Sequence, residues 1–330
     1  MKNYFLIILV AALVLALGCA APEIKLFTDA TTPLQEFILQ GKEEGKVLVI
    51  PISGIISDDP KERFLRTMPS IVQEVVSQLQ LAEKDNEVKA ILLKIDSPGG
   101  STTASDLLYH EIMDFKKRKN VKVVVSMMGV AASGGYYISL PADFIMAHPT
   151  TITGSIGVIF IRPMVANLMN KIGLDIVVNK SGENKDMGSP FRLATIQEQK
   201  ILQNLTDELG QRFMSLVAKH RKLDKEVLDK IATARVYLAE EALQIGLIDK
   251  IGYLSDAILQ AKRLSGLSEN AKVVTYRRTK YPNDNLYNTS TAQLNAGGVS
   301  LIDLRLLDSL TPIRTGFYYL WSPALKYRSR

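Results

Sequence analysis

The chain has 330 residues, 47% of them hydrophobic, which is enough to bury the core of one large α/β domain or of two lobes. The net charge is +6, but the basic residues are scattered apart from the run Lys116–Lys119, which is typical of the solvated end of a helix. This pattern argues against a nucleic-acid partner and fits a surface that faces anionic lipid headgroups. The single cysteine, Cys19, excludes an intramolecular disulfide.

The N-terminus has the layout of a bacterial targeting signal. Lys2 precedes an uncharged apolar run over residues 5–17, which is shorter than the ~20 residues that a membrane-spanning helix needs. Gly18-Cys19 then resembles a lipobox, although alanine replaces the usual leucine three positions before the cysteine. We expect residues 1–18 to be a signal peptide and Cys19 to carry lipid, with an uncleaved N-terminal anchor as the alternative. Both place the rest of the chain at the cell membrane, on its extracytoplasmic side.

Beyond a polar tether over residues 19–45, strands and helices alternate. Nearly continuous apolar runs predict strands, and apolar residues at helical spacing predict helices. The predicted strands cover 47–52, 88–95 and 121–127, and the predicted helices cover 71–81 and 101–119. This alternation predicts an α/β fold whose parallel sheet is layered by helices and buried on both faces.

A second part of the same domain begins near residue 160. Its predicted elements are helices over 164–172, 195–219 and 239–243 and a strand over 176–178. We expect the main domain to span 46–275 and a C-terminal extension to span 276–330. The extension starts with a loose linker rich in Asn, Thr and Gly, and its apolar cluster Phe317–Trp321 has no assignment.

Ser133 is the candidate nucleophile. It lies between two alanines and two glycines, just after a predicted strand and where a helix begins. Small neighbours let a substrate backbone approach, and a helix N-terminus presents free N–H groups. The alternative is a tight N-cap turn without function. The segment Asp96–Gly100 also ends a buried strand, and its glycine amides are candidates for holding an oxyanion.

A hydroxyl nucleophile needs a general base, and the residues leave two candidates. His148 is the histidine nearest to Ser133 in sequence, and Lys185 is the competitor. A lysine serves as base only if its site lowers the ordinary lysine pKa of about 10.4 towards neutrality. His110 and His220 share no metal-ligand spacing with His148, so we expect no metal and no other cofactor.

Five segments together resemble the signal peptide peptidase A family of bacterial Ser/Lys peptidases. Each segment is weak evidence alone, but their order and spacing over residues 45 to 270 make the set specific. The segments are IDSPGG at Ile95–Gly100, ASGGYY at Ala132–Tyr137, TGSIGVI at Thr153–Ile159, KSGENKDMGSPFR at Lys180–Arg192 and AEEALQIGLID at Ala239–Asp249.

The resemblance implies a fold similar to the Clp-protease and crotonase group, a repeated β-β-α superhelix, over the domain 46–275. It implies Ser133 as nucleophile and Lys185 as general base. Ser155 would orient Lys185, and Gly100 would provide an oxyanion N–H. His148 falls where the family needs no histidine and is expected to be structural.

The resemblance also implies peptide substrates such as signal-peptide remnants, and a ring-like homo-oligomer in which adjacent subunits bring Ser133 and Lys185 together. A lysine base requires that Asp186 point away from the Lys185 ammonium, or pair with Lys180 or Arg192 instead. Two other interpretations stay open on the residues alone. One is a crotonase-like acyl-CoA enzyme, and the other is an inactive membrane scaffold of the same fold.

Overall fold

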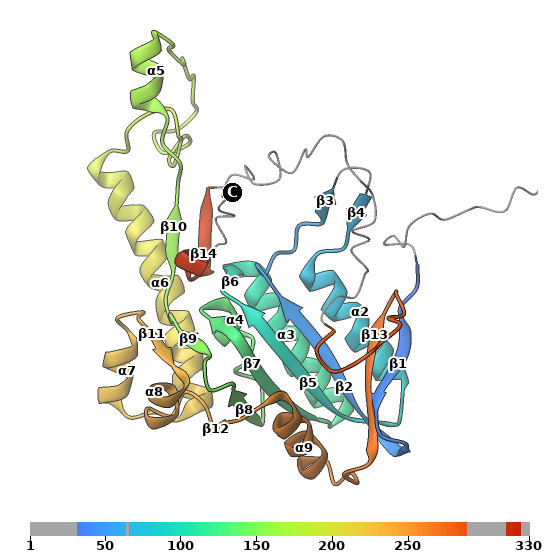
Figure 1. Cartoon of the computed structure of the whole chain (residues 1–330). Helices are drawn as coiled ribbons and strands as arrows, with labels where there is room; N and C mark the ends of the chain where they lie inside the picture. The colour runs from blue at the N-terminus through green and yellow to red at the C-terminus, as the bar shows by residue number, and fades with distance from the viewer. Residues whose placement is uncertain (1–31, 64–65, 289–314, 325–330) are drawn as a thin grey trace, which may run out of the picture.

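The computed structural model describes residues 32–63, 66–288 and 315–324 (Figure 1). The predicted signal peptide, residues 1–18, and the predicted lipid site, Cys19, lie outside the described residues. Within the described ranges, no helix is both long and apolar enough to cross a membrane.

A nine-stranded sheet forms the centre of the molecule. Neighbouring strands from β13 to β12 are parallel, and β1 joins the edge antiparallel to β13. Two further strands, β9 (Ile152–Gly154) and β11 (Val236–Leu238), extend the sheet beside the end of β7. The main order is β1 (Gln35–Gln40), β13 (Ala271–Arg277), β2 (Glu43–Ser53), β5 (Val88–Ser97), β7 (Lys122–Ala132), β8 (Phe144–Ala147) and β12 (Lys250–Ile251).

Helices cover both faces of this sheet (Figure 1). Alternating residues of β2 show why: Leu48 and Ile50 pack with the helices α2 and α3, whereas Val47 and Val49 pack with α9. A strand buried on both faces reads as a continuous apolar run, so the prediction of a doubly covered parallel sheet is confirmed. The covering helices are α2 (Ile71–Lys84), α3 (Thr102–Lys119) and α9 (Leu254–Leu264).

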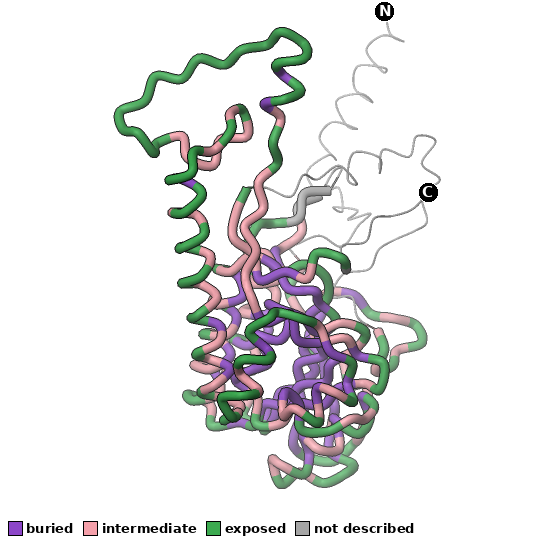
Figure 2. The backbone as a smooth tube through the Cα atoms, turned by 90° about the vertical axis from the view of Figure 1, so that its left-hand side faces the viewer, coloured by how far each residue is buried: buried purple, intermediate pink, exposed green. Residues whose placement is uncertain are grey.

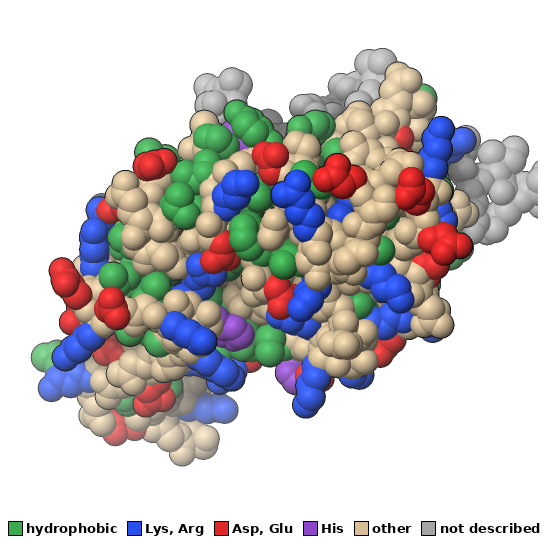
Figure 3. Space-filling view, turned by 90° about the horizontal axis from the view of Figure 1, so that it is seen from below, with side chains coloured by type: hydrophobic (Ala, Val, Ile, Leu, Met, Phe, Trp, Pro, Cys, Tyr) green, Lys and Arg blue, Asp and Glu red, His purple; other side chains and the backbone are tan. Residues whose placement is uncertain are grey.

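The basic run ends α3, as predicted. Lys116 pairs with Asp143 over 2.9 Å, and Arg118 pairs with Glu83 over 2.9 Å. Asn120 then ends the helix with φ 51°. Cations at a helix C-terminus complement the helix dipole. The face shown in Figure 3 likewise carries Lys and Arg interspersed with Asp and Glu, rather than gathered into a field of one sign.

Helix α6 (Ile196–Arg221) leaves the body of the molecule and carries an arm at its N-terminal end (Figures 1 and 2). Its C-terminal half packs on the body through the fully buried Phe213 and Val217. Beyond it lie α5 (Ala166–Ile172) and the connection to α6. The strand predicted over 176–178 is wrong, because this segment pairs with none of the described strands and Val177 is 87% exposed.

The tether predicted over 19–45 does not extend past residue 34, because residues 35–40 form β1 and β2 starts at Glu43. An edge strand with one solvated face reads as polar, and its partner β13 is more than 200 residues away in sequence. The remaining elements are β3 (Lys61–Arg63), β4 (Arg66–Met68), β6 (Gly99–Ser101), α4 (Gly134–Tyr137), β10 (Ile159–Ile161), α7 (Lys225–Ile231), α8 (Ala239–Gln244), β14 (Gly316–Leu320) and a 3-10 helix (Ser322–Ala324).

Candidate active site

Ser133 stands where β7 ends and the short helix α4 begins. Its backbone has φ 53° and ψ −115°, a left-handed conformation that is strained by about 1–3 kcal/mol for a non-glycine residue. The Ser133 N–H donates to the Gly154 carbonyl oxygen over 2.7 Å, which fixes the turn against β9. Ser133 is 1% exposed, and its Oγ has no hydrogen-bond partner in the described chain. A buried, unpaired hydroxyl on a strained strand-to-helix turn is suited to a nucleophile.

The double-glycine loop that starts β6 packs against this turn with no side chain between them. A Cβ at Gly100 would lie 1.8 Å from the Ile56 carbonyl oxygen, and a Cβ at Gly99 would lie 2.6 Å from the Gly134 nitrogen. Gly99 therefore lets β6 approach α4, and Gly100 lets β6 approach the backbone of Ile56. Gly99 thus lies against the Gly134 nitrogen of the nucleophile turn, and backbone amides close to a nucleophile are the groups from which an oxyanion site is built.

Ser155 is the next residue after Gly154, whose carbonyl oxygen accepts the Ser133 N–H. Its own backbone has φ 51°, and its N–H donates to the Arg235 carbonyl oxygen over 2.8 Å. β9 runs parallel to the end of β7 with Gly154 opposite Ala132, so Ser155 lies at the same end of the sheet as Ser133. The structure thus brings three of the predicted site residues, Ser133, Gly100 and Ser155, to the C-terminal end of β7.

Lys185 lies elsewhere. It is exposed, within a series of turns between α5 and α6, and its backbone N–H donates to the Gly182 carbonyl oxygen over 3.1 Å. This connection sits at the far end of α6, away from the central sheet (Figure 1). Since Ser133 Oγ has no partner, the predicted Ser–Lys pair is not formed within one described chain.

The expectation for Asp186 is confirmed. Its carboxylate pairs with Lys180 over 2.8 Å and with Arg192 over 2.7 Å. Asp186, which is next to Lys185 in sequence, is therefore paired with cations other than Lys185. Lys180 and Arg192 were predicted as alternative partners of Asp186, and Asp186 binds both at once.

All three histidines have partners away from Ser133. A ring nitrogen of His148 lies 2.9 Å from Thr150 Oγ1, and His220 contacts the Tyr109 hydroxyl over 2.8 Å. His110 faces Asp114 on α3. No cluster of three or more His, Cys, Asp or Glu side chains that could hold a metal ion occurs in the described parts of the chain.

One element at the site was not foreseen. The C-terminal strand β14 lies between β10 and β6, antiparallel to both, with Tyr319 opposite Gly100 and Leu320 opposite Gly99. The Tyr319 carbonyl oxygen is so near that a Cβ at Gly99 would be 2.0 Å from it and one at Gly134 3.0 Å. The signal was present as the apolar cluster at residues 317–321, but nothing local to it points to β6.

The side chain of Tyr319 helps to hold β14 in place. Its ring stacks on Tyr137 at 4.9 Å between centroids and contacts Phe213 of α6 at 4.9 Å. Its hydroxyl donates to the Leu209 carbonyl oxygen over 3.1 Å. Burial raises the pKa of Tyr319 to about 12. Through Tyr319, the aromatic cluster links β14 to Tyr137 of α4 and to Phe213 of α6.

The arm exposes an unusual amount of apolar surface. Scattered apolar side chains are normal on a protein surface, but a contiguous set marks an interaction site. The exposed large apolar residues between β10 and the first turn of α6 are Met164, Leu168, Ile172, Leu174, Ile176, Val177, Val178, Phe191, Leu193 and Ile196. They flank the loop that carries Lys185.

Comparisons with known proteins find mainly proteases. A model of peptidase family S49 matches residues 115–268, and a Clp protease model matches residues 66–151. An Enterococcus faecium protein named as a signal peptide peptidase is 32% identical over 253 residues, which are 77% of this chain and 73% of that protein. A Methanocaldococcus jannaschii protein named as a protease is 39% identical over 201 residues, 61% of this chain and 64% of that protein. Protease 4 of Haemophilus influenzae is 34% identical over 267 residues, 80% of this chain but 42% of its own length.

The layered α/β fold, the nucleophile turn and these relatives define a serine peptidase of Clp-protease-like fold. The chain belongs to peptidase family S49, and its resemblance to the signal peptide peptidase A family is confirmed.

Proposed function

We propose that this serine peptidase cleaves peptide bonds with Ser133 as nucleophile and Lys185 as general base. The observation that carries the proposal is the buried, unpartnered Ser133 Oγ on a strained turn beside glycine amides. Neutral Lys185 takes the Oγ proton while Oγ attacks the substrate carbonyl. The Gly100 N–H and a neighbouring amide stabilise the oxyanion. Lys185 then protonates the leaving amine, and water releases the acyl group from Ser133.

The proposal includes a homo-oligomeric ring, because one chain keeps Lys185 on its arm and Ser133 in its body. The exposed apolar residues of the arm supply a surface for a second copy. A head-to-tail interface repeated by rotation closes into a ring and gives every subunit the same neighbour. In this arrangement each arm delivers Lys185 to the Ser133 of the next copy, where Ser155 orients it.

Extended apolar peptides, including signal-peptide remnants, are the proposed substrates. The sheet position between β6 and β10 accepts an extended backbone, since the chain's own β14 occupies it. Main-chain hydrogen bonds of this kind give affinity for a peptide of any sequence, and the side chains around the strand determine which peptide side chains are preferred. The neighbours here are aromatic, among them Tyr137 and Phe213. The relative from Enterococcus faecium is named for signal peptides, which are apolar.

Anchoring at the extracytoplasmic side of the cell membrane through lipidated Cys19 completes the proposal. If Cys19 is the lipid site, the purified membrane protein should begin at this residue and carry a diacylglycerol mass on it. Mass spectrometry of N-terminal peptides measures both. Recovery of an intact peptide spanning residues 1–18 would instead establish an uncleaved anchor.

Mixing two inactive variants tests the shared active site. Ser133→Ala and Lys185→Ala chains are each expected to leave casein uncleaved. Co-expressed in equal amounts, they should recover about a quarter of wild-type activity, because a site works wherever an intact Ser133 meets an intact Lys185 from its neighbour. An inactive mixture would show that both residues must come from one chain. Undiminished activity of Ser133→Ala alone would refute the nucleophile, and an inactive wild type would favour the scaffold interpretation.

A further inference from the structure

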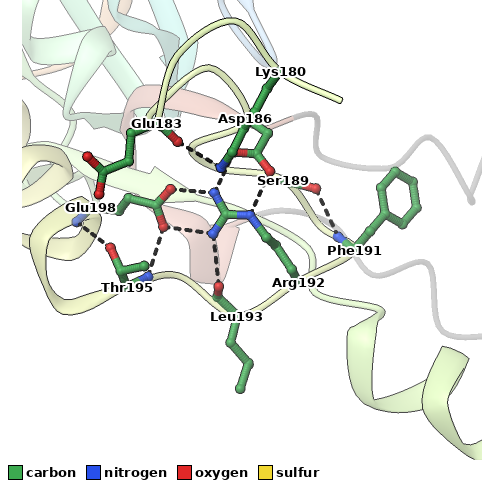
Figure 4. Close-up of polar contacts among 9 residues, drawn as sticks. All are labelled: Lys180, Glu183, Asp186, Ser189, Phe191, Arg192, Leu193, Thr195 and Glu198. Atoms are coloured by element: carbon green, nitrogen blue, oxygen red, sulfur yellow. Dashed lines mark hydrogen bonds and ion pairs between the residues drawn. The ribbon is translucent and has the colours of Figure 1, made fainter. Parts of the chain in front are cut away.

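Arg192 lies between two carboxylates at the base of the Lys185 loop (Figure 4). Its Nε and Nη2 donate to the two oxygens of Asp186, each over 2.7 Å. Nη1 donates to Glu198 over 2.9 Å and to the Leu193 carbonyl oxygen over 3.1 Å, and Nη2 also donates to Glu198. All five guanidinium N–H donors are thereby used, which a lysine ammonium with three donors cannot reproduce.

The second carboxylate that binds Arg192, that of Glu198, lies in the first turn of α6. Glu198 is the third residue of that helix, and its carboxylate accepts the Thr195 N–H over 2.8 Å. The Thr195 hydroxyl accepts the Glu198 N–H over 3.1 Å in return, which completes a capping box. The Glu198 side chain is 3% exposed. Arg192 lowers the pKa of Glu198 to about 2, so Glu198 is charged at neutral pH.

The first carboxylate that binds Arg192 is that of Asp186, which is next to Lys185 in sequence. Arg192 first, and Lys180 second, hold the Asp186 pKa well below its usual range. Asp186 is therefore ionised whenever a lysine base is active. A carboxylate this close to Lys185 in the chain would stabilise the protonated ammonium if it turned towards it, and a protonated lysine accepts no proton.

We propose that Arg192 is a positioning residue for the general base, which holds Asp186 towards α6 and away from the Lys185 ammonium. The inference rests on the proposed role of Lys185 and goes beyond it. The charged groups that bear on Asp186 in the described chain are Lys180 and Arg192 from the loop and Glu198 from α6. Arg192 is the group that joins Asp186 to the helix, because the hydrogen bonds of Lys180 in the described chain go to Glu183 and Asp186, both in the same loop.

The test is the pH profile of casein cleavage by the full-length protein. In Arg192→Met, Asp186 loses the partner that ties it to α6, and the pH at which activity rises should move about one unit or more towards alkali. Activity on the acid side should therefore fall about tenfold and recover at high pH. Adding Asp186→Asn to this variant should return the rise to the wild-type pH. Arg118→Met removes an exposed arginine–carboxylate pair with Glu83 on the body and should leave the pH profile unchanged.

Two outcomes would overturn the proposal: a loss of activity in Arg192→Met that is equal at every pH, or a double variant that fails to restore the profile. Either would leave Arg192 with a purely structural role. Should the Met variant fail to fold, Arg192→Lys keeps a charge near Asp186 and must give a smaller shift in the same direction. Lys185→Ala separates the role of Lys185 as general base from the role of Arg192 in positioning it. If Lys185→Ala stays active, Lys185 is not the base, and the proposed function fails together with the positioning role.

Discussion

Replacing Lys185 by alanine is expected to lower kcat/KM by at least about 10³-fold, because nucleophile and base act as one unit and neither works without the other. Lys185→Arg should be equally inactive, since a guanidinium stays protonated at every accessible pH. In the wild type, activity should rise with pH towards an optimum that is neutral to alkaline, because only the neutral amine accepts the Ser133 proton. Initial rates of peptide cleavage across the pH range measure both effects.

Two controls make this result specific. Lys171→Ala removes an exposed lysine from the same arm and should leave the rate nearly unchanged. His148→Ala should also be nearly silent, because the His148 ring contacts Thr150 and Tyr253 rather than Ser133. A large loss in His148→Ala together with an active Lys185→Ala would reassign the base to histidine. A rate that peaks in acid and falls above neutrality would contradict a lysine base of any kind.

Deleting residues 316–330 is expected to lower KM for short peptides about tenfold or more with little change in kcat. β14 occupies the strand position that we propose for the peptide substrate, and a segment tethered to the same chain competes at an effective concentration in the millimolar range. A free substrate at micromolar concentration has to displace it. Steady-state kinetics of the full and shortened chains give KM and kcat separately.

The shortened chain needs its own control, because Tyr319 also packs against Tyr137 and Phe213. Its unfolding midpoint should be measured beside its kinetics. A synthetic peptide with the sequence of residues 316–321 should inhibit the shortened enzyme competitively, and a scrambled peptide should not. An unchanged KM in a folded, shortened enzyme would mean that β14 only completes the fold.

The sequence predicted the central layers of the fold well, because each strand and helix there is defined by its own local pattern. The run 47–52 alternates between two buried faces, and the apolar spacing within 101–119 predicts a helix that the structure forms as α3. The edges were harder to predict. β1 and β14 owe their conformation to partners far away in the chain, and local polarity does not identify a distant partner.

The same distinction applies to the site. Ser133 and Gly100 lie in short motifs whose residue types are dictated by close backbone contact, so the motifs are visible in sequence. The ion pairs of Asp186 were foreseen because all three residues lie within one loop. The link from Arg192 to Glu198 was not predicted, because Glu198 lies in the first turn of α6 and not in the loop.

The glycine contacts beside Ser133 bear on attempts to redesign the enzyme. A methyl group at Gly100 would meet the Ile56 carbonyl oxygen at 1.8 Å, and one at Gly134 would meet Ser105 Oγ at 2.5 Å. Libraries that randomise these two loops would therefore return mostly misfolded chains, however large they are. New cleavage preferences have to be selected in the strands and helices that surround the loops. Exposed residues of α6 beyond Glu198, such as Lys200, are positions where variation is compatible with folding.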